Sequence, residues 1–361
     1  MRIAFDVSPL SHTPLGIGNY IRGTLSGLVE AAAGEHEIVA FAPTSLRGPE
    51  RIRSALEGVD VELRLWPLPW SHALRTAWSR AGHPAAERLL GRFDVLHFTD
   101  WMYPPQRAGV RATTIHDLVP LHYPEWCTAR TVSMHRRKYE NTARTCDLVL
   151  VNSAYTRRDV ERTLQIPRER IHVAHPGVRP VFRQEGDAAD LGAPYVLTVA
   201  TLEPRKNLST LLEAHGLLGD EFTLAVVGSK GWGRQPLLDR PRVRRFGFVP
   251  EDELAGLYRG AAVAVYPSRF EGFGIPVVEA MACGTPVVSS SHPSLDEASG
   301  NAAIRADPED AAAIASAIEH AVLWREEIAA RGRAHAARFT WRAAGATLLR
   351  GYEEAAARRP R

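Results

Sequence analysis

The stretch Ala261–Ser290, AAVAVYPSRFEGFGIPVVEAMACGTPVVSS, holds a strand pattern, a glycine-rich loop, a helix pattern and a second strand pattern in close succession. The β-branched runs at Val263–Tyr266 and Thr285–Val288 predict the two strands. The helix between them, over about Pro276–Cys283, begins with a proline, which suits a first helical position. It ends before Gly284, where a left-handed residue is favoured. Strand, helix and strand in this order predict a parallel α/β sheet.

The same stretch carries two carboxylates, Glu271 and Glu279, on either side of the predicted helix start. A helix N-terminus presents free N–H groups and a partial positive charge, which favour phosphate. Gly272 and Gly274 would let the backbone approach such a ligand closely. Ionised carboxylates accept hydrogen bonds from sugar hydroxyls. The stretch therefore predicts a site for a phosphorylated, hydroxyl-rich small molecule.

The composition bounds the class of protein. With 361 residues the chain exceeds the usual size of one core, so two domains are expected. Its 44 basic and 41 acidic residues are too balanced to favour nucleic acid as a partner. There is no apolar run of the roughly 20 residues that span a bilayer, and MRIAFDVSPL is a strand pattern rather than a signal peptide. The three cysteines lack metal-ligand spacing, so we expect a cytoplasmic protein without disulfides.

Strand and helix patterns alternate along the chain in two series, which predict two Rossmann-like, doubly wound domains facing a central cleft. The first series has strands at Ile3–Val7, Glu37–Phe41, Val61–Leu65, Val95–His97, Ala112–Ile115, Leu148–Val151 and Ile171–Ala174. The second has strands at Tyr195–Ala200, Thr223–Val227, Val243–Phe246, Val263–Tyr266 and Thr285–Val288. We expect an N-terminal domain at 1–178, a Pro- and Gly-rich linker at 179–192 and a C-terminal domain at 193–339. A last helix at about 340–361 is expected to cross back to the first domain.

Three segments occur in the order TLEPRKNLSTLLEA, FGFVPEDELAGLYRGA and SRFEGFGIPVVEAMACGTPVV. Over essentially its whole length the chain resembles the family-4 retaining glycosyltransferases of the GT-B fold. In that family a Glu-x7-Glu pattern precedes and enters a helix at the donor site, as Glu271 and Glu279 do here. The resemblance implies transfer of a hexose from a nucleotide-diphosphate sugar, without a metal and without a further cofactor.

The resemblance also implies roles for residues of the second domain. Glu279 would hold the ribose, and Glu271 would contact the donor sugar. The backbone at Phe273, Gly274 and Ile275 would hold the phosphates, and Phe248 and Val249 would border the base. The physical alternative for Glu279 is a favourable contact with the helix dipole, worth about 0.3–1 kcal/mol.

Arg205 and Lys206 follow the predicted strand at Tyr195–Ala200 and open a predicted helix. Departure of a nucleoside diphosphate builds negative charge, which two cations at a helix N-terminus can stabilise. Family members often have an arginine at the end of the preceding strand. Ala200 and Thr201 stand there in this chain, so Arg205 is the expected substitute. A solvated basic helix start is the alternative.

In the first domain, His116 ends a predicted strand, and the resemblance implies that it contacts the donor sugar or the reacting centre. Asp117 either serves the acceptor or caps the next turn. Gly16 and Gly18 follow the first predicted strand and open the first predicted helix, and in the family the matching glycine-rich loop approaches the phosphates or the acceptor. A plain helix-entry turn is the alternative for these glycines, since the spacing fails as a dinucleotide fingerprint.

The segment from Trp66 to Trp70, with Arg75, Arg80 and Arg88 after it, combines aromatic and basic residues. Such a combination predicts an acceptor face or a contact with an anionic membrane surface, while arginines on an ordinary exposed helix are the simpler reading. The sequence contains neither a zinc-type cluster nor an apolar strand that ends in Asp-x-Asp. We therefore expect no metal.

The sequence thus predicts a retaining hexosyltransferase, cytoplasmic or peripheral at the inner face of the membrane. Its acceptor would be a saccharide, lipid-linked or small-molecule compound. The segments HDLVPLHYPEW and TLEPRKNL resemble those of bacterial mannosyl- or rhamnosyltransferases of surface-polysaccharide assembly. This resemblance favours GDP-mannose as the donor. The alternatives are a non-catalytic nucleotide-sugar-binding protein, a nucleotide-sugar epimerase and, with less support, a phosphorylase.

Overall fold

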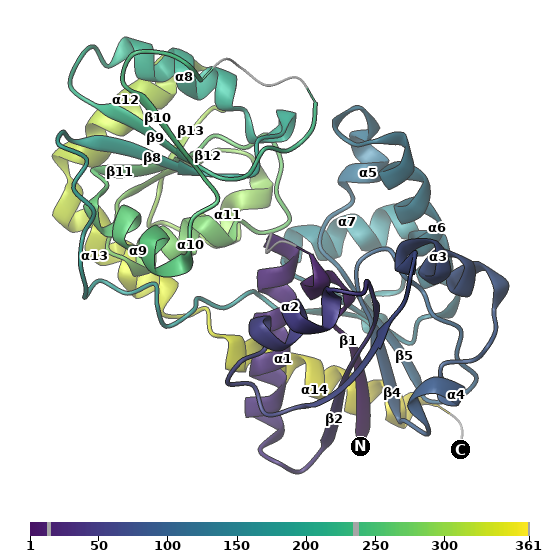
Figure 1. Ribbon diagram of the computed structural model, residues 1–361. Helices are drawn as coiled ribbons and strands as arrows, with labels where there is room; N and C mark the ends of the chain where they lie inside the picture. The colour runs from purple at the N-terminus through teal and green to yellow at the C-terminus, as the bar shows by residue number, and fades with distance from the viewer. Residues whose placement is uncertain (13–15, 234–237, 360–361) are drawn as a thin grey trace. The chain divides into compact units, whose positions relative to one another are not determined.

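The computed structural model describes residues 1–12, 16–233 and 238–359 of the chain (Figure 1). The chain divides into two compact units. Unit 1 comprises Met1–His122, Ala129–Gly177 and Thr340–Arg361, and unit 2 comprises Tyr123–Thr128 and Val178–Phe339. Each unit is built on one parallel sheet with alternating helices. The prediction of two Rossmann-like α/β domains is therefore confirmed.

The sheet of unit 1 has seven parallel strands in the order β3-β2-β1-β4-β5-β6-β7. The strands are β1 (Arg2–Asp6), β2 (Glu37–Thr44), β3 (Glu62–Pro67), β4 (Val95–Phe98), β5 (Val110–Ile115), β6 (Leu148–Val151) and β7 (Ile171–Val173). Successive side chains of β1 enter different cores: Ile3 and Phe5 join one apolar cluster, and Ala4 joins another. Burial on both faces explains why these strands read as continuous apolar runs.

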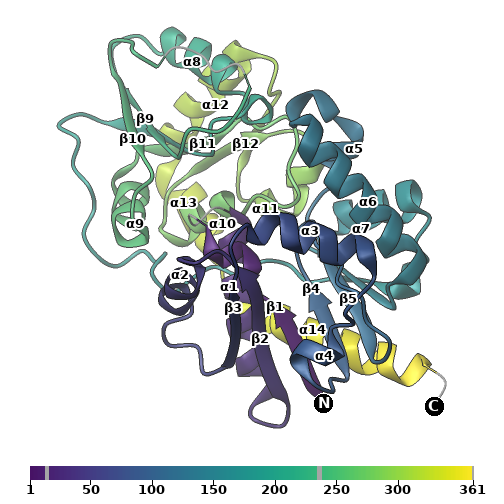
Figure 2. The same cartoon turned by 45° about the vertical axis from the view of Figure 1, so that its right-hand side comes forward.

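The helices of unit 1 connect and cover these strands (Figure 2). They are α1 (Gly16–Ala32), α2 (Gly48–Ala55), α3 (Ser71–Ala81), α4 (Glu87–Leu90), α5 (Val119–His122), α6 (Ala129–Thr145), α7 (Ala154–Leu164) and α14 (Trp341–Arg358). Short 3-10 helices occur at η1 (Ser8–Ser11) and η3 (Arg168–Arg170). The N-terminus of α7 is capped by Ser153, whose side chain accepts from the Thr156 N–H, as its sequence position predicts.

Helix α14, yellow in Figure 1, packs against α1, purple, within unit 1. The two backbones meet at glycines. A Cβ at Gly27 would overlap the Trp341 carbonyl, and one at Gly345 would overlap the Gly27 carbonyl. The close approach therefore requires residues without side chains, and it ties the C-terminal helix to the first helix of the chain.

The sheet of unit 2 has six parallel strands in the order β10-β9-β8-β11-β12-β13. The strands are β8 (Tyr195–Val199), β9 (Thr223–Val227), β10 (Val243–Gly247), β11 (Val263–Tyr266), β12 (Val287–Ser290) and β13 (Ile304–Ala306). The helices are α8 (Leu208–Leu217), α9 (Glu251–Gly260), α10 (Ile275–Ala282), α11 (Asp296–Ser299), α12 (Ala311–Leu323) and α13 (Arg325–Ala336). The 3-10 helices of this unit are η2 (Pro124–Trp126), η4 (Pro204–Lys206) and η5 (Pro293–Leu295).

Three segments of unit 2 differ from the sequence expectation. Residues 179–192, expected as a linker, pack on unit 2: Phe182 is buried, and the N–H of Ala189 donates to the Gly256 carbonyl. Strand β12 begins at Val287 rather than Thr285, because the Thr285 N–H still bonds back to the Ala280 carbonyl at the end of α10. Strand β13 was not predicted, since three residues carry too little pattern.

Each sheet has one topological switch point, where neighbouring strands send their connections to opposite sides. In unit 1 it lies between β1 and β4, and in unit 2 between β8 and β11. Ligands of open parallel sheets bind beyond the carboxyl ends of the strands at such points. The fold therefore marks one candidate position in each unit.

The contact between α1 and α14 predicts a large effect of a single methyl group. We expect Gly27→Ala to destabilise the protein by about 1–3 kcal/mol, because the added Cβ forces two helix backbones apart. The matched control is Gly216→Ala in α8, where nothing lies within 4 Å of an added Cβ. Removing a helical glycine there should stabilise by up to about 1 kcal/mol. The midpoint temperatures of thermal unfolding of the two variants test this prediction. Equal midpoints in the two variants would contradict a close contact between α1 and α14.

Candidate functional site

The switch point of unit 2 brings together Arg205, Lys206 and Glu271 from two separate loops. Arg205 and Lys206 lie in η4, which follows β8, and Glu271 lies in the loop between β11 and α10. The two cations were expected to open a helix, and this expectation is corrected. Asn207 adopts a left-handed conformation (φ 55°) and becomes the N-cap of α8, so the cations precede that helix. They therefore sit in a short turn of their own.

Glu271 is the hub of an ion-pair cluster. One carboxylate oxygen accepts from Arg205 Nη1 at 2.7 Å, and the other accepts from Lys206 Nζ at 2.5 Å. Arg205 also donates through Nε to Glu203 at 2.6 Å. The backbone N–H of Glu271 donates to Ser294 Oγ at 2.9 Å. Two carboxylates thus balance two cations at this edge of the sheet.

The cluster controls the protonation of Glu271. Burial by itself would raise the pKa of this carboxyl. The charges of Arg205 and Lys206 together outweigh that effect and lower the pKa to about 2. Its side chain is only 13% exposed. Glu271 is therefore a fully ionised acceptor of hydrogen bonds throughout the physiological pH range.

Gly274 is the N-cap of α10 and fixes how the loop enters this helix. Its φ is 101°, and a Cβ at this position would lie 2.5 Å from Leu295 Cδ2, so both conformation and space favour glycine. The Phe273 side chain is buried in the core and packs edge-on against Phe339. Phe273 can therefore serve a ligand through its backbone alone, while Ile275 is half-buried at the start of the helix.

Glu279 lies on α10 with a side chain that the core almost completely covers, since the residue is 7% exposed. Burial raises its pKa to about 7, although Arg179 and a hydrogen bond with Tyr258 oppose the shift. A contact with the helix dipole alone does not require such burial. Glu279 is therefore a desolvated carboxyl whose neighbours in the protein are Tyr258 and Arg179.

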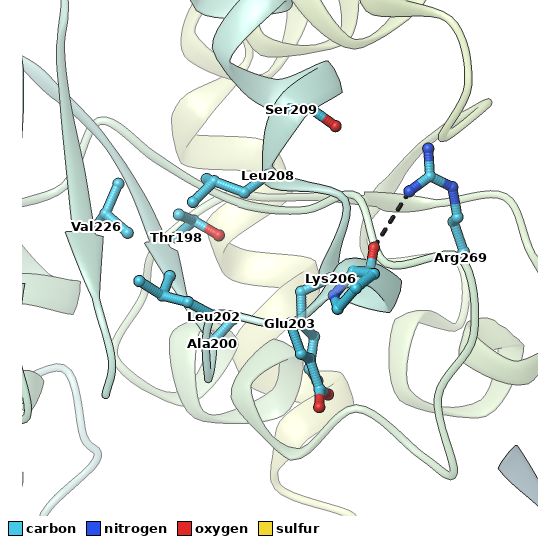
Figure 3. A pocket seen from close by; sticks show the side chains of 10 residues that line it. Thr198, Ala200, Leu202, Glu203, Lys206, Leu208, Ser209, Val226 and Arg269 are labelled. Atoms are coloured by element: carbon cyan, nitrogen blue, oxygen red, sulfur yellow. Dashed lines mark hydrogen bonds between the residues drawn. The ribbon is translucent and has the colours of Figure 1, made fainter. Parts of the chain in front are cut away.

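A pocket opens beside this cluster at the carboxyl ends of β8 and β9 (Figure 3). Figure 3 shows Thr198, Leu208 and Val226 on its apolar side, with Glu203, Lys206 and Arg269 toward the loops. Sequence reasoning did not single out Glu203 or Arg269. Glu203 stands two residues before Arg205, a spacing that signals an ion pair. Arg269 donates to the Pro204 carbonyl and pairs with Glu309, contacts that no local pattern reveals.

The expected base-binding residues follow β10 and have different environments. Phe248 is 53% exposed, whereas Val249 is buried in the core of unit 2. Only Phe248 therefore offers a side-chain surface to a ligand, and Val249 would contribute its backbone.

In unit 1, His116 follows β5 at the carboxyl edge of the sheet. Its ring packs edge-on against Tyr20 of α1 at 4.6 Å between centroids. Its Nε2 is buried and has no hydrogen-bond partner among the described residues. Burial, and after it Lys138, lowers the pKa of His116 to about 3, so the imidazole is neutral. A neutral ring with an unused nitrogen is suited to binding a hydroxyl group.

The other expected residues of unit 1 take simpler positions. Gly16 and Gly18 lie in the first turn of α1, as expected for residues that open the first helix, and residues 13–15 lie outside the described residues. Asp117 accepts from the Val119 N–H and so caps the next turn. An acceptor contact is not needed to explain that carboxylate.

The aromatic and basic segment before and along α3 is not a uniform exposed face. Trp70 is 84% exposed, but Arg75 is 4% exposed and lies over the Trp101 ring at 5.1 Å. Arg75 is thus an interior residue, and the expectation that it lines a surface is corrected. Burial lowers the pKa of Arg75, and the charges of Asp6 and Asp100 oppose that shift.

Within the described part of the chain, no group of three or more His, Cys, Asp or Glu side chains is arranged to hold a metal ion. None of its helices combines the length and apolarity needed to cross a membrane.

The sequence of this chain is similar to that of known glycosyltransferases. Residues 15–182 match the family model described as Glycosyltransferase Family 4, and residues 193–323 match the model described as Glycosyl transferases group 1. The Escherichia coli O-antigen chain mannosyltransferase B is 30% identical, over 98% of this chain and 100% of that protein. The Salmonella typhimurium O-antigen chain mannosyltransferase RfbU is 30% identical over 57% of this chain and 59% of its own.

Solved structures share the fold at low identity. Sucrose-phosphate synthase from Thermosynechococcus elongatus superposes with a TM-score of 0.72 at 20% identity, covering 98% of each chain. The Anabaena protein HepE in complex with UDP and glucose gives a TM-score of 0.69 at 16% identity, covering 97% of this chain and 98% of its own. The matches to both family models and the full-length relative at 30% identity show that this chain belongs to the family-4, group-1 glycosyltransferases of the GT-B fold.

Proposed function

We propose that this glycosyltransferase transfers a mannosyl residue from GDP-mannose to a saccharide, lipid-linked or small-molecule acceptor, with retention of the anomeric configuration. The mannosyl assignment is supported by the two O-antigen mannosyltransferases to which the chain is similar. Retention is supported by the family resemblance of the donor motif. Nuclear magnetic resonance of the product, which reads the anomeric coupling, tests retention directly.

The observation that carries the proposal is the cluster of Arg205, Lys206 and Glu271 at the switch point of unit 2. A nucleoside diphosphate leaving group gains negative charge as the glycosidic bond breaks. Fixed cations in a partly buried site stabilise that charge by several kcal/mol, against about 0–1 kcal/mol for an exposed ion pair. Lys206 and Arg205 are held in place before the substrate arrives, because Glu271 binds both.

Arrival of the diphosphate changes the partners of these cations. The phosphates compete with Glu271 for Lys206 and Arg205, so the Glu271 carboxylate becomes available to the hydroxyls of the donor sugar. Arg205 keeps its second carboxylate, Glu203, and so remains oriented. One residue therefore serves first to position the cations and then to bind the sugar.

On α10, the buried carboxyl of Glu279 accepts hydrogen bonds from the ribose hydroxyls, and the Phe273, Gly274 and Ile275 backbone serves the phosphates. Phe248 borders the base with its exposed ring. His116 of unit 1 has an unused Nε2 that can donate or accept a hydrogen bond at a substrate hydroxyl.

The reaction in this proposal requires neither a metal nor a cofactor, because the two cations neutralise the leaving group. Transfer should therefore persist in EDTA. The expected location is the cytoplasm or the inner face of the membrane, because the three cysteines form no disulfide among the described residues, which is typical of a reducing compartment. The alternative functions are a non-catalytic nucleotide-sugar binder and an epimerase. Slow release of GDP from GDP-mannose in the absence of acceptor would separate a transferase from both.

Nucleotide selectivity gives the first prediction of this proposal. In calorimetry with EDTA present, we expect GDP to bind more tightly than UDP, dTDP or ADP. Lys206→Ala should weaken binding of GDP at least tenfold, because a partly buried cation loses its phosphate partner. The control Lys230→Ala removes a lysine of the same unit that does not line this pocket, and binding should not change. If no nucleotide binds without a divalent metal, the diphosphate role of the cluster is wrong.

The two glutamates give a second prediction, with opposite signs. The pKa of Glu271 is lowered, so its ionised form stabilises the fold above about pH 4.5, and that contribution is lost as pH falls toward 2. The pKa of Glu279 is raised, so its ionised form destabilises the fold above pH 7, and the penalty disappears as pH falls toward 4.5. At pH 8, Glu271→Gln should lower and Glu279→Gln should raise stability, each by about 1–3 kcal/mol.

The affinity of the same two variants for GDP is the second part of this test. Glu279→Gln should weaken GDP binding although it stabilises the protein, because the ribose loses an ionic acceptor. Glu271→Gln should tighten GDP binding about fivefold, which corresponds to about 1 kcal/mol of removed repulsion, while transfer falls. Equal shifts of both variants in the same direction, in unfolding at pH 8, would show that the two carboxyls do not differ in environment.

A further inference from the structure

The switch point of unit 1 holds a second group of ionisable side chains. Asp6 ends β1, and Asp100 is the second residue after the neighbouring strand β4. Strand ends at a switch point form the position where open parallel sheets bind ligands. In unit 2 the equivalent position is occupied by the proposed donor residues. The position in unit 1 therefore offers a site for the other substrate.

The two aspartates differ in how far the protein already satisfies them. Asp6 is fully buried, and its carboxylate accepts from the N–H and Oγ of Ser8 and from the N–H and Oγ1 of Thr99, at 2.5–3.1 Å. Asp6 is a structural link between β1 and β4. Within the described residues, no side chain donates a hydrogen bond to Asp100.

Asp100 has a left-handed backbone, with φ at 54°. Aspartate enters this region more readily than most other non-glycine residues. The Asp100 side chain is 27% exposed, and its Oδ1 lies 3.9 Å from His135 Nε2. The carboxylate is thus reachable from solvent and only loosely engaged by the protein.

Two buried cations, Lys138 and Arg75, interact with the Asp100 carboxylate through their charges. Lys138 of α6 is 2% exposed, and its Nζ donates to the Thr114 carbonyl at 2.7 Å. Arg75 of α3 is 4% exposed, and its Nε has no partner among the described residues. The His135 ring, also on α6, has a buried Nδ1 that is likewise unpartnered in the part of the chain described. Donors of unit 1 are therefore left unused around Asp100.

The charges of this group identify the class of ligand. Asp6 and Asp100 balance Arg75 and Lys138, so the position has no excess positive charge for a phosphate. The accessible member is the Asp100 carboxylate, while both cations are covered. Burial raises the pKa of Asp100 to about 6 against the opposing effect of Lys138, which leaves the group ionised at neutral pH. An ionised carboxylate accepts hydrogen bonds from hydroxyls and repels anions.

We infer that Asp100 binds a hydroxyl group of a neutral saccharide acceptor at the switch point of unit 1. The inference rests on the proposed function, since it assigns the second substrate of that reaction. Lys138 and Arg75 act on this carboxylate through their charges, which lower its pKa against the effect of burial. A site built around such a hydrogen bond discriminates strongly against ligands that lack the hydroxyl.

The test uses Asp100→Asn and Asp100→Gly in the full chain. Asparagine tolerates the left-handed conformation and glycine adopts it freely, so both variants should fold, and the glycine variant should unfold at or above the temperature of the wild type. The matched control is Asp60→Asn, because Asp60 is an exposed aspartate of the same unit. The probe acceptor is octyl α-mannobioside with GDP-mannose as donor, and the wild type should transfer mannose to it.

We expect kcat/KM for the probe to fall at least tenfold in both Asp100 variants, mainly through KM. Their affinity for GDP and their hydrolysis of GDP-mannose without acceptor should stay within twofold of the wild type. Transfer within twofold of the wild type in both variants would overturn the role of Asp100. A wild type that binds GDP but does not glycosylate the probe would overturn the neutral-saccharide class. Lack of nucleotide binding in the wild type would instead refute the proposed function.

Discussion

The ion pairs of Glu271 with Arg205 and Lys206 are the interaction on which the candidate donor site depends. They join the loops that follow β8 and β11, two neighbouring strands that are far apart in the sequence. Without Glu271, two cations would share a partly buried turn and repel each other. Without the cations, burial would favour the neutral form of Glu271. Each side of the cluster therefore fixes the charge state of the other before any ligand arrives.

The parallel sheet explains why this pairing is possible at all. Within the described residues the paired strands of both sheets are parallel, so the carboxyl ends of neighbouring strands lie at one edge. Loops that leave this edge diverge at the switch point, which leaves space between them. In unit 2 that edge carries Glu271 and Lys206, and in unit 1 it carries Asp100 and His116. The same constraint thus places reactive polar groups twice in one chain, although the residues share no sequence pattern.

Much of this arrangement was predictable from local signals. Helix α10 was expected over Pro276–Cys283 and spans Ile275–Ala282, because a proline and a left-handed glycine mark its ends. Long-range pairing was not predictable. The spacing of arginines along α3 gives no sign that Arg75 turns inward toward Trp101. Nor does a sequence pattern show that the Lys206 ammonium is already paired, since its partner lies 65 residues away.

The two switch points also show why charge counting from sequence gives an incomplete account of function. Each combines two carboxylates with two cations, so neither attracts a ligand through net charge. What distinguishes them is which group remains accessible. In unit 2 Lys206 lines the pocket beside Glu203, and in our proposal a diphosphate replaces the carboxylate as its partner. In unit 1 both cations are buried and the Asp100 side chain is 27% exposed, so the inferred ligand is a hydroxyl donor. Burial, rather than composition, distinguishes the two positions.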